Sequence, residues 1–297
     1  MNYLLRSMLY VPAYNSKFIA KAIESDADAI IFDFEDSCPL EKEEEGRENV
    51  RRVLESGALN GRQVFLRVNE LGTTSLMKDL ELLQCCGILG IMPPKVNNAD
   101  DMRAFDKLVS EKETQYNLKS GSIKFTPLIE TAGAIVNLDE IAMSSDRIIA
   151  LTFGGEDYLD SIWGVHTEPP VAFDVPRALL VQVARKHGVL PIDTPYLDLQ
   201  NEAGYRHEEG ISASMGFAGN LLVNPRQIPW ANEVFSPSED EVVYARRVVE
   251  AVRETLKSGG SIAVLDGKMI GPPMRKRAEK VVALANLIEE FKNHNKV

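Results

Sequence analysis

Two acidic residues, Glu130 and Asp157, follow apolar segments that have the composition of buried strands. Glu130 comes directly after FTPLI, and Asp157 comes after IIALTF and a short glycine-rich turn. Carboxylates that meet at one place repel each other unless a cation lies between them. Oxygen ligands without a nearby histidine suit Mg²⁺, which usually takes one or two carboxylates plus water and substrate oxygens. The pair therefore predicts a magnesium site, and a helix N-cap or a rim salt bridge is the alternative for either acid.

Arg67 lies in the apolar segment VFLRVNE, where an unpaired guanidinium would be costly. It needs an anionic partner, for which Glu35, Asp36 and a substrate carboxylate are the candidates. A purely structural pairing is the alternative. Lys95 has two interpretations, a Schiff-base lysine or a cation that flanks a helix, and its place in a loop favours the second. The histidines end no predicted strand and are assigned no catalytic role.

The elements that would position these side chains recur along the first three quarters of the chain. Short apolar runs start about 30 residues apart, which is the repeat of a (β/α)₈ barrel. Their apolarity is continuous, as in parallel strands that are buried on both faces. Helical patterns lie between them, for example at Ala99–Val109 and Pro176–Lys186. The predicted strands are Ser7–Val11, Ala29–Phe34, Val64–Val68, Gly90–Met92, Phe125–Ile129, Ile148–Phe153, Leu190–Ile192 and Asn220–Val223.

Active sites of (β/α)₈ barrels lie at the carboxyl ends of the strands. Charged or amide side chains follow nearly every predicted strand, so these residues should meet at one mouth. Arg6 starts the first strand and would lie at the other end unless that strand begins earlier. The residues at or just after the carboxyl ends of the predicted strands, called strand exits below, are Asp33, Glu35, Asp36, Arg67, Asn69, Lys95, Glu130, Glu156, Asp157, Asp193 and Asn224.

The C-terminal part has a different pattern and is predicted to be a helical extension, or lid, of residues 231–297 after a barrel of residues 1–230. A long helix is expected at Glu239–Lys257, capped by Ser238. A short apolar run, Ser261–Leu265, precedes a final helix from about Met274 to Lys292. Such an extension packs on its own barrel or reaches a neighbouring subunit.

Composition and charge restrict the partners and the compartment. The 297 residues fit one barrel with an extension, and 44% of them are hydrophobic. The net charge is −11 and no basic stripe is present, so we expect no nucleic-acid partner. The three cysteines match no zinc spacing and argue for a reducing compartment. With no run of about 18 apolar residues and no secretory signal, we expect a cytoplasmic protein without a membrane partner.

Nine segments together resemble one family over essentially the whole chain. They are RSMLYVP, IFDFEDS, RVNE, PPKV, LIET, FGGEDY, DTPYLD with NEAG, VNPRQI and DGKMIGPP. Their identity and order are similar to the citrate lyase beta subunit family, which includes the citramalyl-CoA and malyl-CoA lyases. NEAG and NPRQI are nearest to the citrate lyase beta subunit branch.

This resemblance implies a (β/α)₈ barrel, Mg²⁺, and a CoA or acyl-carrier thioester substrate. It also implies a homotrimer, or a multiple of one, in which the C-terminal segment of one subunit covers the site of the next. The implied reaction cleaves a 3-hydroxyacyl thioester of the citramalyl, malyl or citryl type. The products are an acetyl thioester and a 2-oxo acid.

The resemblance also implies roles for individual residues. Glu130 and Asp157 match metal ligands, while Arg67 and Glu130 match substrate contacts. Arg67 is the expected electrostatic partner of the enolate that leaves. Further expected members are two acids that support catalysis and two cations that lie toward the CoA phosphates: Glu35, Asp36, Arg6 and Lys17.

Two departures from the family pattern keep other functions open. Gly271 stands where members usually carry an aspartate, and Ala218-Gly219-Asn220 replaces the usual Asp-Gly-Lys. Asp266 lies near Gly271 in sequence and is a substitute proton donor. One alternative is a metal-dependent aldolase that acts on a free 2-oxo acid aldol. The other is a CoA-binding or acyl-carrier-binding subunit with reduced catalysis.

Overall fold

The structure of the chain, a computed structural model, describes residues 3–294. The chain folds as two compact units, of which the first is Leu5–Phe235 and the second contains the segment from Ser236 onward. The boundary expected after residue 230 falls inside helix α10 (Ile228–Val234), which belongs to the first unit.

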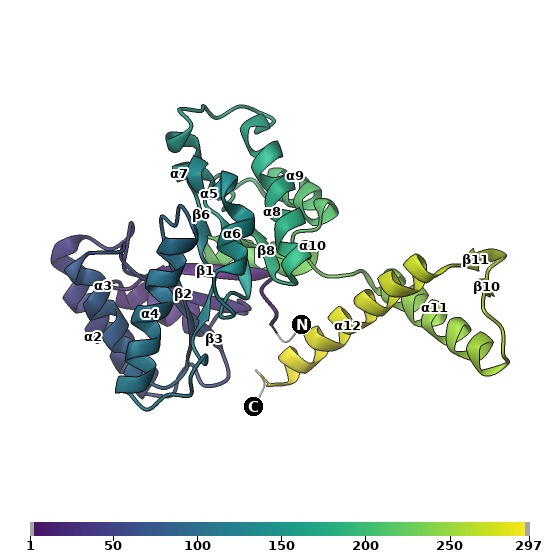
Figure 1. Ribbon diagram of the computed structural model, residues 1–297, viewed down its shortest axis with the longest axis horizontal. Helices are drawn as coiled ribbons and strands as arrows, with labels where there is room; N and C mark the ends of the chain where they lie inside the picture. Colours follow the sequence, from purple (N-terminus) through teal and green to yellow (C-terminus); the bar gives the residue numbers. More distant parts are fainter. Residues whose placement is uncertain (1–2, 295–297) are drawn as a thin grey trace. The chain divides into compact units, whose positions relative to one another are not determined.

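A nine-stranded parallel sheet forms the centre of the first unit (Figure 1). The strands follow the order β5-β4-β3-β2-β1-β9-β8-β7-β6, so neighbours in sequence are neighbours in space. All the predicted apolar runs contribute strands. Their bounds are β1 Ser7–Pro12, β2 Ala29–Asp33, β3 Gln63–Arg67, β4 Ile88–Met92, β5 Lys124–Phe125, β6 Leu128–Ile129, β7 Ala150–Phe153, β8 Leu190–Asp193 and β9 Gly219–Leu222.

The two outer strands of this order, β5 and β6, are the halves of one segment, and this closes the sheet. On one side, the Thr126 amide donates to the Ile91 carbonyl in β4 at 3.0 Å. On the other, the Thr152 amide in β7 donates to the Pro127 carbonyl at 3.1 Å. The predicted (β/α)₈ barrel is therefore confirmed. The single strand expected at Phe125–Ile129 is broken in two, because Pro127 has no N–H to donate to a ladder.

Helices follow the strands and surround the barrel (Figure 1). The pattern predicted at Ala99–Val109 is α4, which a capping box of Asn98 and Asp101 starts and which buries Met102 and Phe105. The helix bounds in this unit are α1 Ser16–Ile23, α2 Glu43–Glu55, α3 Thr74–Asp79, α4 Ala99–Gln115, α5 Ala132–Val136, α6 Leu138–Met143, α7 Gly155–Ser161, α8 Asp174–His187, α9 Glu202–Met215 and α10 Ile228–Val234. Short 3₁₀ helices lie at Leu40–Lys42, Leu80–Gln84, Val171–Phe173 and Pro225–Gln227.

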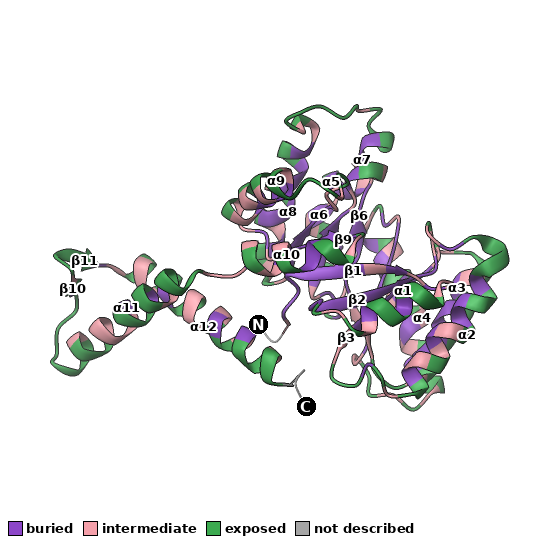
Figure 2. Cartoon of the chain, turned by 180° about the vertical axis from the view of Figure 1, so that it is seen from behind, coloured by how far each residue is buried: buried purple, intermediate pink, exposed green. Residues whose placement is uncertain are grey.

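Strands and the inward faces of the helices form one continuous core (Figure 2). Every residue of β2, β7, β8 and β9 is buried. This burial on both faces explains why the strand segments are apolar throughout instead of alternating.

Gly219 in β9 is required by the close approach of the backbone just before β1. A Cβ atom at this position would lie 1.9 Å from the Leu5 carbonyl oxygen and 2.6 Å from the Arg6 Cα, both of which are backbone atoms. We therefore expect Gly219→Ala to lower the free energy of unfolding by about 3 kcal/mol or more, through overpacking that side chains cannot relieve. Urea denaturation measures this directly.

Gly210 in α9 provides the matched control, since a Cβ there would meet no atom within 4 Å. Gly210→Ala should raise stability by roughly 0.5–1 kcal/mol, because alanine is the better helix former. Equal effects of the two substitutions would contradict the close approach of β9 to the backbone of Leu5 and Arg6.

The second unit is a helical hairpin with a small sheet. Helix α11 (Glu239–Lys257) begins with a capping box of Ser238 and Glu241. Strands β10 (Ala263–Leu265) and β11 (Lys268–Ile270) form an antiparallel hairpin, which the sequence interpretation did not include. Its core consists of buried residues from all four elements: Ala245, Val248, Ala263, Ile270 and Ala278.

Helix α12 runs over Pro272–His294, two residues earlier than the expected start at Met274. The hairpin turn holds Asp266 and Gly267, both with positive φ, as a tight two-residue turn requires. Within residues 3–294, no helix combines the length and apolarity that are needed to cross a membrane.

Candidate active site

A cavity of about 260 Å³ opens at the carboxyl ends of the barrel strands. One part of its wall carries charged side chains and another part is apolar. The structure brings four residues with a predicted catalytic, substrate or metal role to this wall, namely Asp36, Arg67, Glu130 and Asp157, together with Asp33 and Glu156 from the predicted strand ends. The rest of the wall is Tyr10, Pro12, Ser37, Leu128, Gly154, Gly155, Thr194, Pro195, Leu197, Leu221 and Val223.

Glu130 directly follows β6 and is 1% exposed. One of its carboxylate oxygens accepts a hydrogen bond from the backbone N–H of Lys95 at 2.6 Å. The N-cap of the next helix, α5, is Thr131, whose hydroxyl accepts from the Ala134 amide. Glu130 is therefore not a helix cap, and its carboxylate is directed to the cavity.

Asp157 stands in the first turn of α7 and is half-buried. Within residues 3–294 the structure records no hydrogen bond or ion pair to its carboxylate, so it is not the rim salt bridge that the alternative required. Gly154 precedes it, and a Cβ there would lie 2.6 Å from the Cβ of Glu130. Only glycine lets α7 begin so close to Glu130 and bring both carboxylates to one cavity.

Burial and neighbouring negative charge make Glu130 hard to ionise. Burial is the main cause that raises its pKa to about 9, and Asp157 and Glu35 raise it further against the Lys95 amide. A divalent cation between Glu130 and Asp157 would remove this repulsion. Residues 3–294 contain no group of three or more side chains with metal-ligand spacing. Two carboxylates without a third protein ligand still fit Mg²⁺, which usually takes one or two carboxylates and completes its shell with water and substrate oxygens.

Because the pKa of Glu130 is about 9, the carboxyl group is protonated at pH 7 without a metal. A metal ligand must be deprotonated, so Mg²⁺ binding should release close to one proton per site near pH 7. The apparent affinity should then rise roughly tenfold per pH unit below pH 9. Calorimetry in buffers with different ionisation enthalpies measures the released protons.

The same pKa also predicts how the folding stability of the metal-free protein changes with pH. The folded-state pKa lies above the ordinary value of 4.5, so the metal-free protein loses stability as pH rises from 4.5 toward 9. Saturating Mg²⁺ should reverse this loss. An apparent Mg²⁺ affinity that is constant over this range would show that Glu130 is not a ligand.

Arg67 ends β3 and is the centre of an ionic network. Its Nε and Nη2 donate to the two oxygens of Asp33, both at 2.6 Å, and its Nη1 lies 3.2 Å from Glu35 and from Asp36. The Tyr10 ring lies below it, with the guanidinium carbon 4.6 Å from the ring centre. Burial opposes ionisation of Asp33, but Arg67 and the bond from Ser37 hold its pKa below the ordinary value.

Lys95 connects this network to Glu130. It lies after β4 with a positive φ of 51°, and its Nζ lies 3.1 Å from Glu35 and 3.0 Å from Glu70. Burial raises the pKa of Glu35 despite the adjacent Arg67. Sequence interpretation favoured a helix-flanking cation for Lys95, and the structure pairs its ammonium with Glu35 and Glu70 without placing Lys95 in the cavity wall. The sequence interpretation did not identify Tyr10 and Thr194, which do line the cavity.

The two cations expected near the CoA phosphates lie in different places. Arg6 precedes β1 at the amino end of the barrel and is 6% exposed. Its guanidinium binds both oxygens of Asp28 at 2.8 Å, so the structure does not bring Arg6 to the cavity. Lys17 is exposed in the first turn of α1, which follows the carboxyl end of β1.

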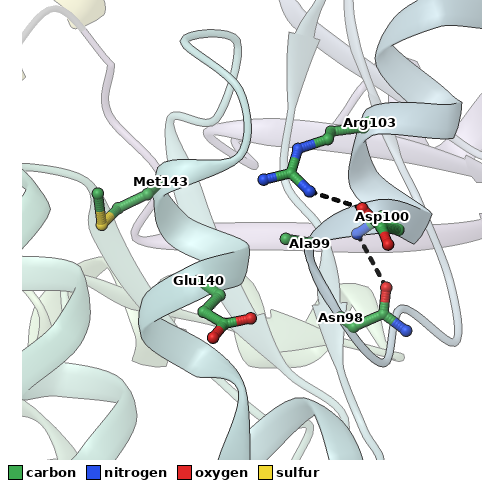
Figure 3. A pocket seen from close by; sticks show the side chains of 6 residues that line it. All are labelled: Asn98, Ala99, Asp100, Arg103, Glu140 and Met143. Carbon is green, nitrogen blue, oxygen red and sulfur yellow. Dashed lines mark hydrogen bonds and ion pairs between the residues drawn. The ribbon is translucent and has the colours of Figure 1, made fainter.

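A more open hollow of about 450 Å³ lies between α4 and α6 (Figure 3). Its one guanidinium, Arg103, is paired with the neighbouring Asp100 at 2.6 Å. All the charged side chains that line it are exposed, and none comes from a strand exit. The hollow therefore lacks the buried, converging groups of the barrel mouth.

Comparison with known proteins agrees with this geometry. The sequence pattern of the HpcH/HpaI aldolase/citrate lyase family matches residues 6–225. Citrate lyase subunit beta of Escherichia coli strain K12 is 33% identical over 282 residues, which are 95% of this chain and 93% of that protein. L-malyl-CoA/beta-methylmalyl-CoA lyase of Cereibacter sphaeroides is 30% identical over 303 residues, and the match covers 95% of this chain and 95% of that protein.

Among solved structures, the protein CitE of Mycobacterium tuberculosis is similar in fold. Its complex with magnesium, acetoacetate and coenzyme A superposes with a TM-score of 0.74 at 26% identity. The match covers 94% of this chain and 97% of that one.

Proposed function

Because the chain belongs to the HpcH/HpaI aldolase/citrate lyase family, we propose that it is a Mg²⁺-dependent carbon–carbon lyase that acts on an acyl thioester. The substrate is a 3-hydroxyacyl thioester with a free carboxylate, of the citramalyl, malyl or citryl type. Named lyases of this kind match 95% of the chain, and a similar structure holds magnesium and coenzyme A. The observation that carries the proposal is the convergence of Glu130, Asp157 and Arg67 on one cavity.

In this proposal Glu130 and Asp157 hold the cation. When bound, Mg²⁺ supplies a Lewis acid and a template for the hydroxyl and carboxylate oxygens of the substrate. The bond between the hydroxyl-bearing carbon and the α-carbon of the thioester breaks. The hydroxyl carbon becomes the carbonyl carbon of the 2-oxo acid, and the electron pair stays on the thioester as an enolate.

The remaining residues move protons and balance charge. We assign Asp36, which lines the cavity with a side chain 53% exposed, as the acceptor of the hydroxyl proton. Arg67 stabilises the negative charge of the enolate. Glu35 holds Arg67 and Lys95 in place. Transfer to the enolate carbon of the proton that Asp36 took from the hydroxyl then gives the acetyl thioester, so protons and electrons balance without a further reactant.

A turnover assay with mass-spectrometric detection tests the proposed function. Purified protein is incubated with Mg²⁺ and citramalyl-CoA, malyl-CoA or citryl-CoA, with and without EDTA. Cleavage to acetyl-CoA and a 2-oxo acid that EDTA abolishes is the expected result. If folded protein that binds Mg²⁺ cleaved none of the three thioesters, the result would contradict the proposed function.

A second candidate, a CoA-binding or carrier-binding subunit with reduced catalysis, is favoured by Gly271. This residue lies between β11 and α12, where a Cβ atom would meet only Pro273 at 3.8 Å, so an aspartate fits there. Asp266, the substitute proton donor, is paired with Arg247 at 2.6 Å. Tight CoA binding without turnover, together with activity gained by Gly271→Asp, would favour the binding subunit.

The proposal extends to the compartment and the oligomeric state of the enzyme. We propose a cytoplasmic homotrimer, in which the C-terminal unit of one subunit contributes to the site of the next. Sedimentation velocity measures the oligomeric state, and a monomer with full activity would exclude a shared site.

A further inference from the structure

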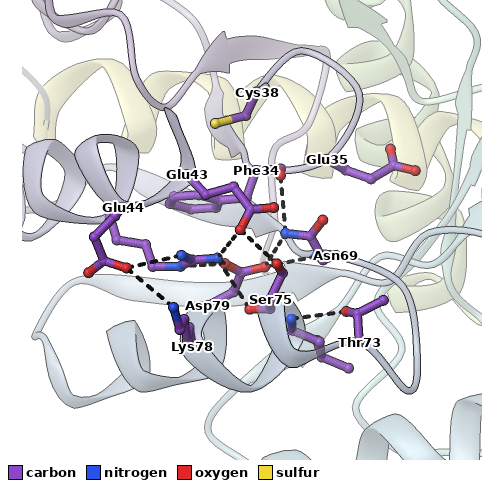
Figure 4. Close-up of polar contacts among 12 residues, drawn as sticks. Phe34, Glu35, Cys38, Glu43, Glu44, Asn69, Thr73, Ser75, Lys78 and Asp79 are labelled. Atoms are coloured by element: carbon purple, nitrogen blue, oxygen red, sulfur yellow. Dashed lines mark hydrogen bonds and ion pairs between the residues drawn. The ribbon is translucent and has the colours of Figure 1, made fainter. Parts of the chain in front are cut away.

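A buried polar cluster lies beside the exits of β2 and β3 and has no part in the reaction described above (Figure 4). Its centre is Asp79, the last residue of α3, which is 0% exposed. Arg47 and Glu43 come from α2, and Asn69 follows β3. None of these residues lines the cavity.

The two oxygens of Asp79 have different partners. Its Oδ1 accepts from the Nε of Arg47 at 2.9 Å and lies 2.8 Å from the Nη2. Its Oδ2 accepts from the backbone N–H of Asn69 at 2.9 Å and from its side-chain amide at 2.8 Å. A carboxylate that only neutralised Arg47 would offer both oxygens to the guanidinium. Asp79 instead connects Arg47 to the segment after β3.

Asn69 passes this connection to the segment after β2. Its side-chain amide also donates to the Phe34 carbonyl at 3.1 Å, and the Phe34 amide donates to the Arg67 carbonyl at 3.0 Å. Phe34 stands between Asp33 and Glu35 in the chain, and Asn69 stands between Arg67 and Glu70. The two segments that Asp79 fixes therefore carry every carboxylate that pairs with Arg67 or with the Lys95 ammonium.

Arg47 is itself held on its far side. Its Nη2 donates to Glu43 at 2.8 Å, and the Ser75 hydroxyl donates to the same Glu43 oxygen at 2.6 Å. The cluster thus runs from α2 through Asp79 and Asn69 to both strand exits without an exposed link.

We propose that Asp79, oriented by Arg47, is a positioning residue that sets the geometry of Arg67 and its carboxylate partners through Asn69 and Phe34. The proposal rests on the proposed lyase function. Asp79 does not touch Glu130 or Asp157, so it should affect the chemical step and not the metal. Misplacement of a catalytic group by about 1 Å costs on the order of 100-fold in rate.

The test uses the full-length protein with Asp79→Asn, which places an amide N–H₂ against donors of Asn69 or Arg47. We expect kcat to fall by about 10- to 100-fold, while the Mg²⁺ affinity stays within about threefold of wild type. Asn69→Ser is the second variant, which removes the bridge to Phe34 but keeps the backbone bond to Asp79. It should reproduce the fall in kcat even where Asp79→Asn does not fold.

Glu113→Gln is the matched control. Glu113 is a carboxylate 2% exposed that pairs with Arg147 at 2.7 Å and accepts backbone N–H groups of Gly121 and Ile123, at the amino end of the barrel. The change should lower stability by a similar mechanism, yet leave kcat within about twofold when assayed where the protein is folded.

Amide hydrogen exchange separates this proposal from the lyase proposal. Asp79→Asn and Asn69→Ser should accelerate exchange in residues 33–37 and 67–70, whereas Glu113→Gln should not. If the wild type cleaves no thioester, the lyase proposal fails while this exchange still tests the connection. Unchanged exchange in both variants, or equal losses of kcat in Asp79→Asn and Glu113→Gln, would overturn the positioning role.

Discussion

Replacing Glu130 with glutamine should lower kcat for thioester cleavage by about 1,000-fold, equivalent to about 4 kcal/mol, because the cation loses its most buried ligand. The thermal stability of the metal-free variant, in contrast, should stay the same or rise. In the metal-free protein above pH 4.5, burial of Glu130 destabilises the folded state, and glutamine removes the ionisable group. The metal-free variant should therefore unfold at the same temperature as wild type or higher, as measured by calorimetry at about pH 8.

Asp157→Asn should have the same effect on turnover and on Mg²⁺ affinity. Asp160→Asn is the control, since Asp160 lies exposed in the same helix and carries the same charge. It should retain kcat within about twofold. Full activity of either Glu130→Gln or Asp157→Asn would exclude the metal assignment, and loss of activity in Asp160→Asn would point to α7 as a whole.

Much of this site follows from the sequence because a barrel converts chain position into spatial position. A polar residue that ends a continuous apolar run must lie at the carboxyl end of a parallel strand, and all such ends share one mouth. That reasoning places Arg67, Glu130 and Asp157 at one cavity without any knowledge of their contacts. The same reasoning places Arg6 at the opposite end, and there the structure buries it against Asp28.

The details that escape the sequence depend on register and loop conformation. Asp33 is the main partner of Arg67 because β2 and β3 pair in the register that sets these two residues side by side. No pattern in either strand specifies that register, so the sequence predicts Glu35, Asp36 or a substrate carboxylate as the partner of Arg67 and misses Asp33. Lys95 pairs with Glu35 and Glu70 from a backbone with a positive φ, which lysine rarely adopts and which no sequence pattern here predicts.

Two structural devices explain how so much negative charge is tolerated at one mouth. Arg67 and Lys95 neutralise the carboxylates on the side of β2 and β3. On the side of β6 and β7, no ion pair to Glu130 or Asp157 is found among the described residues, and burial raises the pKa of Glu130 to about 9 although Arg67 opposes this. The carboxylates near β2 and β3 are therefore neutralised by protein cations, whereas Glu130 and Asp157 leave room for a divalent ion. This asymmetry is the physical reason to assign Arg67 to the chemistry and Glu130 to the metal.

Replacing Arg67 with methionine should lower kcat by about 100- to 1,000-fold, because the enolate loses its electrostatic partner. It should also lower the free energy of unfolding by about 3–5 kcal/mol, since Asp33 would remain buried without its counter-ion. Arg67→Lys should restore part of the stability but little of the activity. The guanidinium of Arg67 uses two nitrogens for the two oxygens of Asp33 and has a third that remains for other partners. The ammonium of lysine has one nitrogen and cannot replace all of these contacts.

Arg147→Met separates the two effects of Arg67→Met. Arg147 is a buried guanidinium paired with Asp106 and Glu113 at 2.8 and 2.7 Å, at the end of the barrel away from the cavity. Its loss should cost a similar amount of stability, measured by urea denaturation, and leave kcat of the folded protein within about twofold. If both methionine variants lost activity in proportion to stability, Arg67 would be a structural residue. An Arg67→Lys variant with full activity would lead to the same conclusion. Only a loss of kcat that exceeds the Arg147 control at equal stability assigns Arg67 to the transition state.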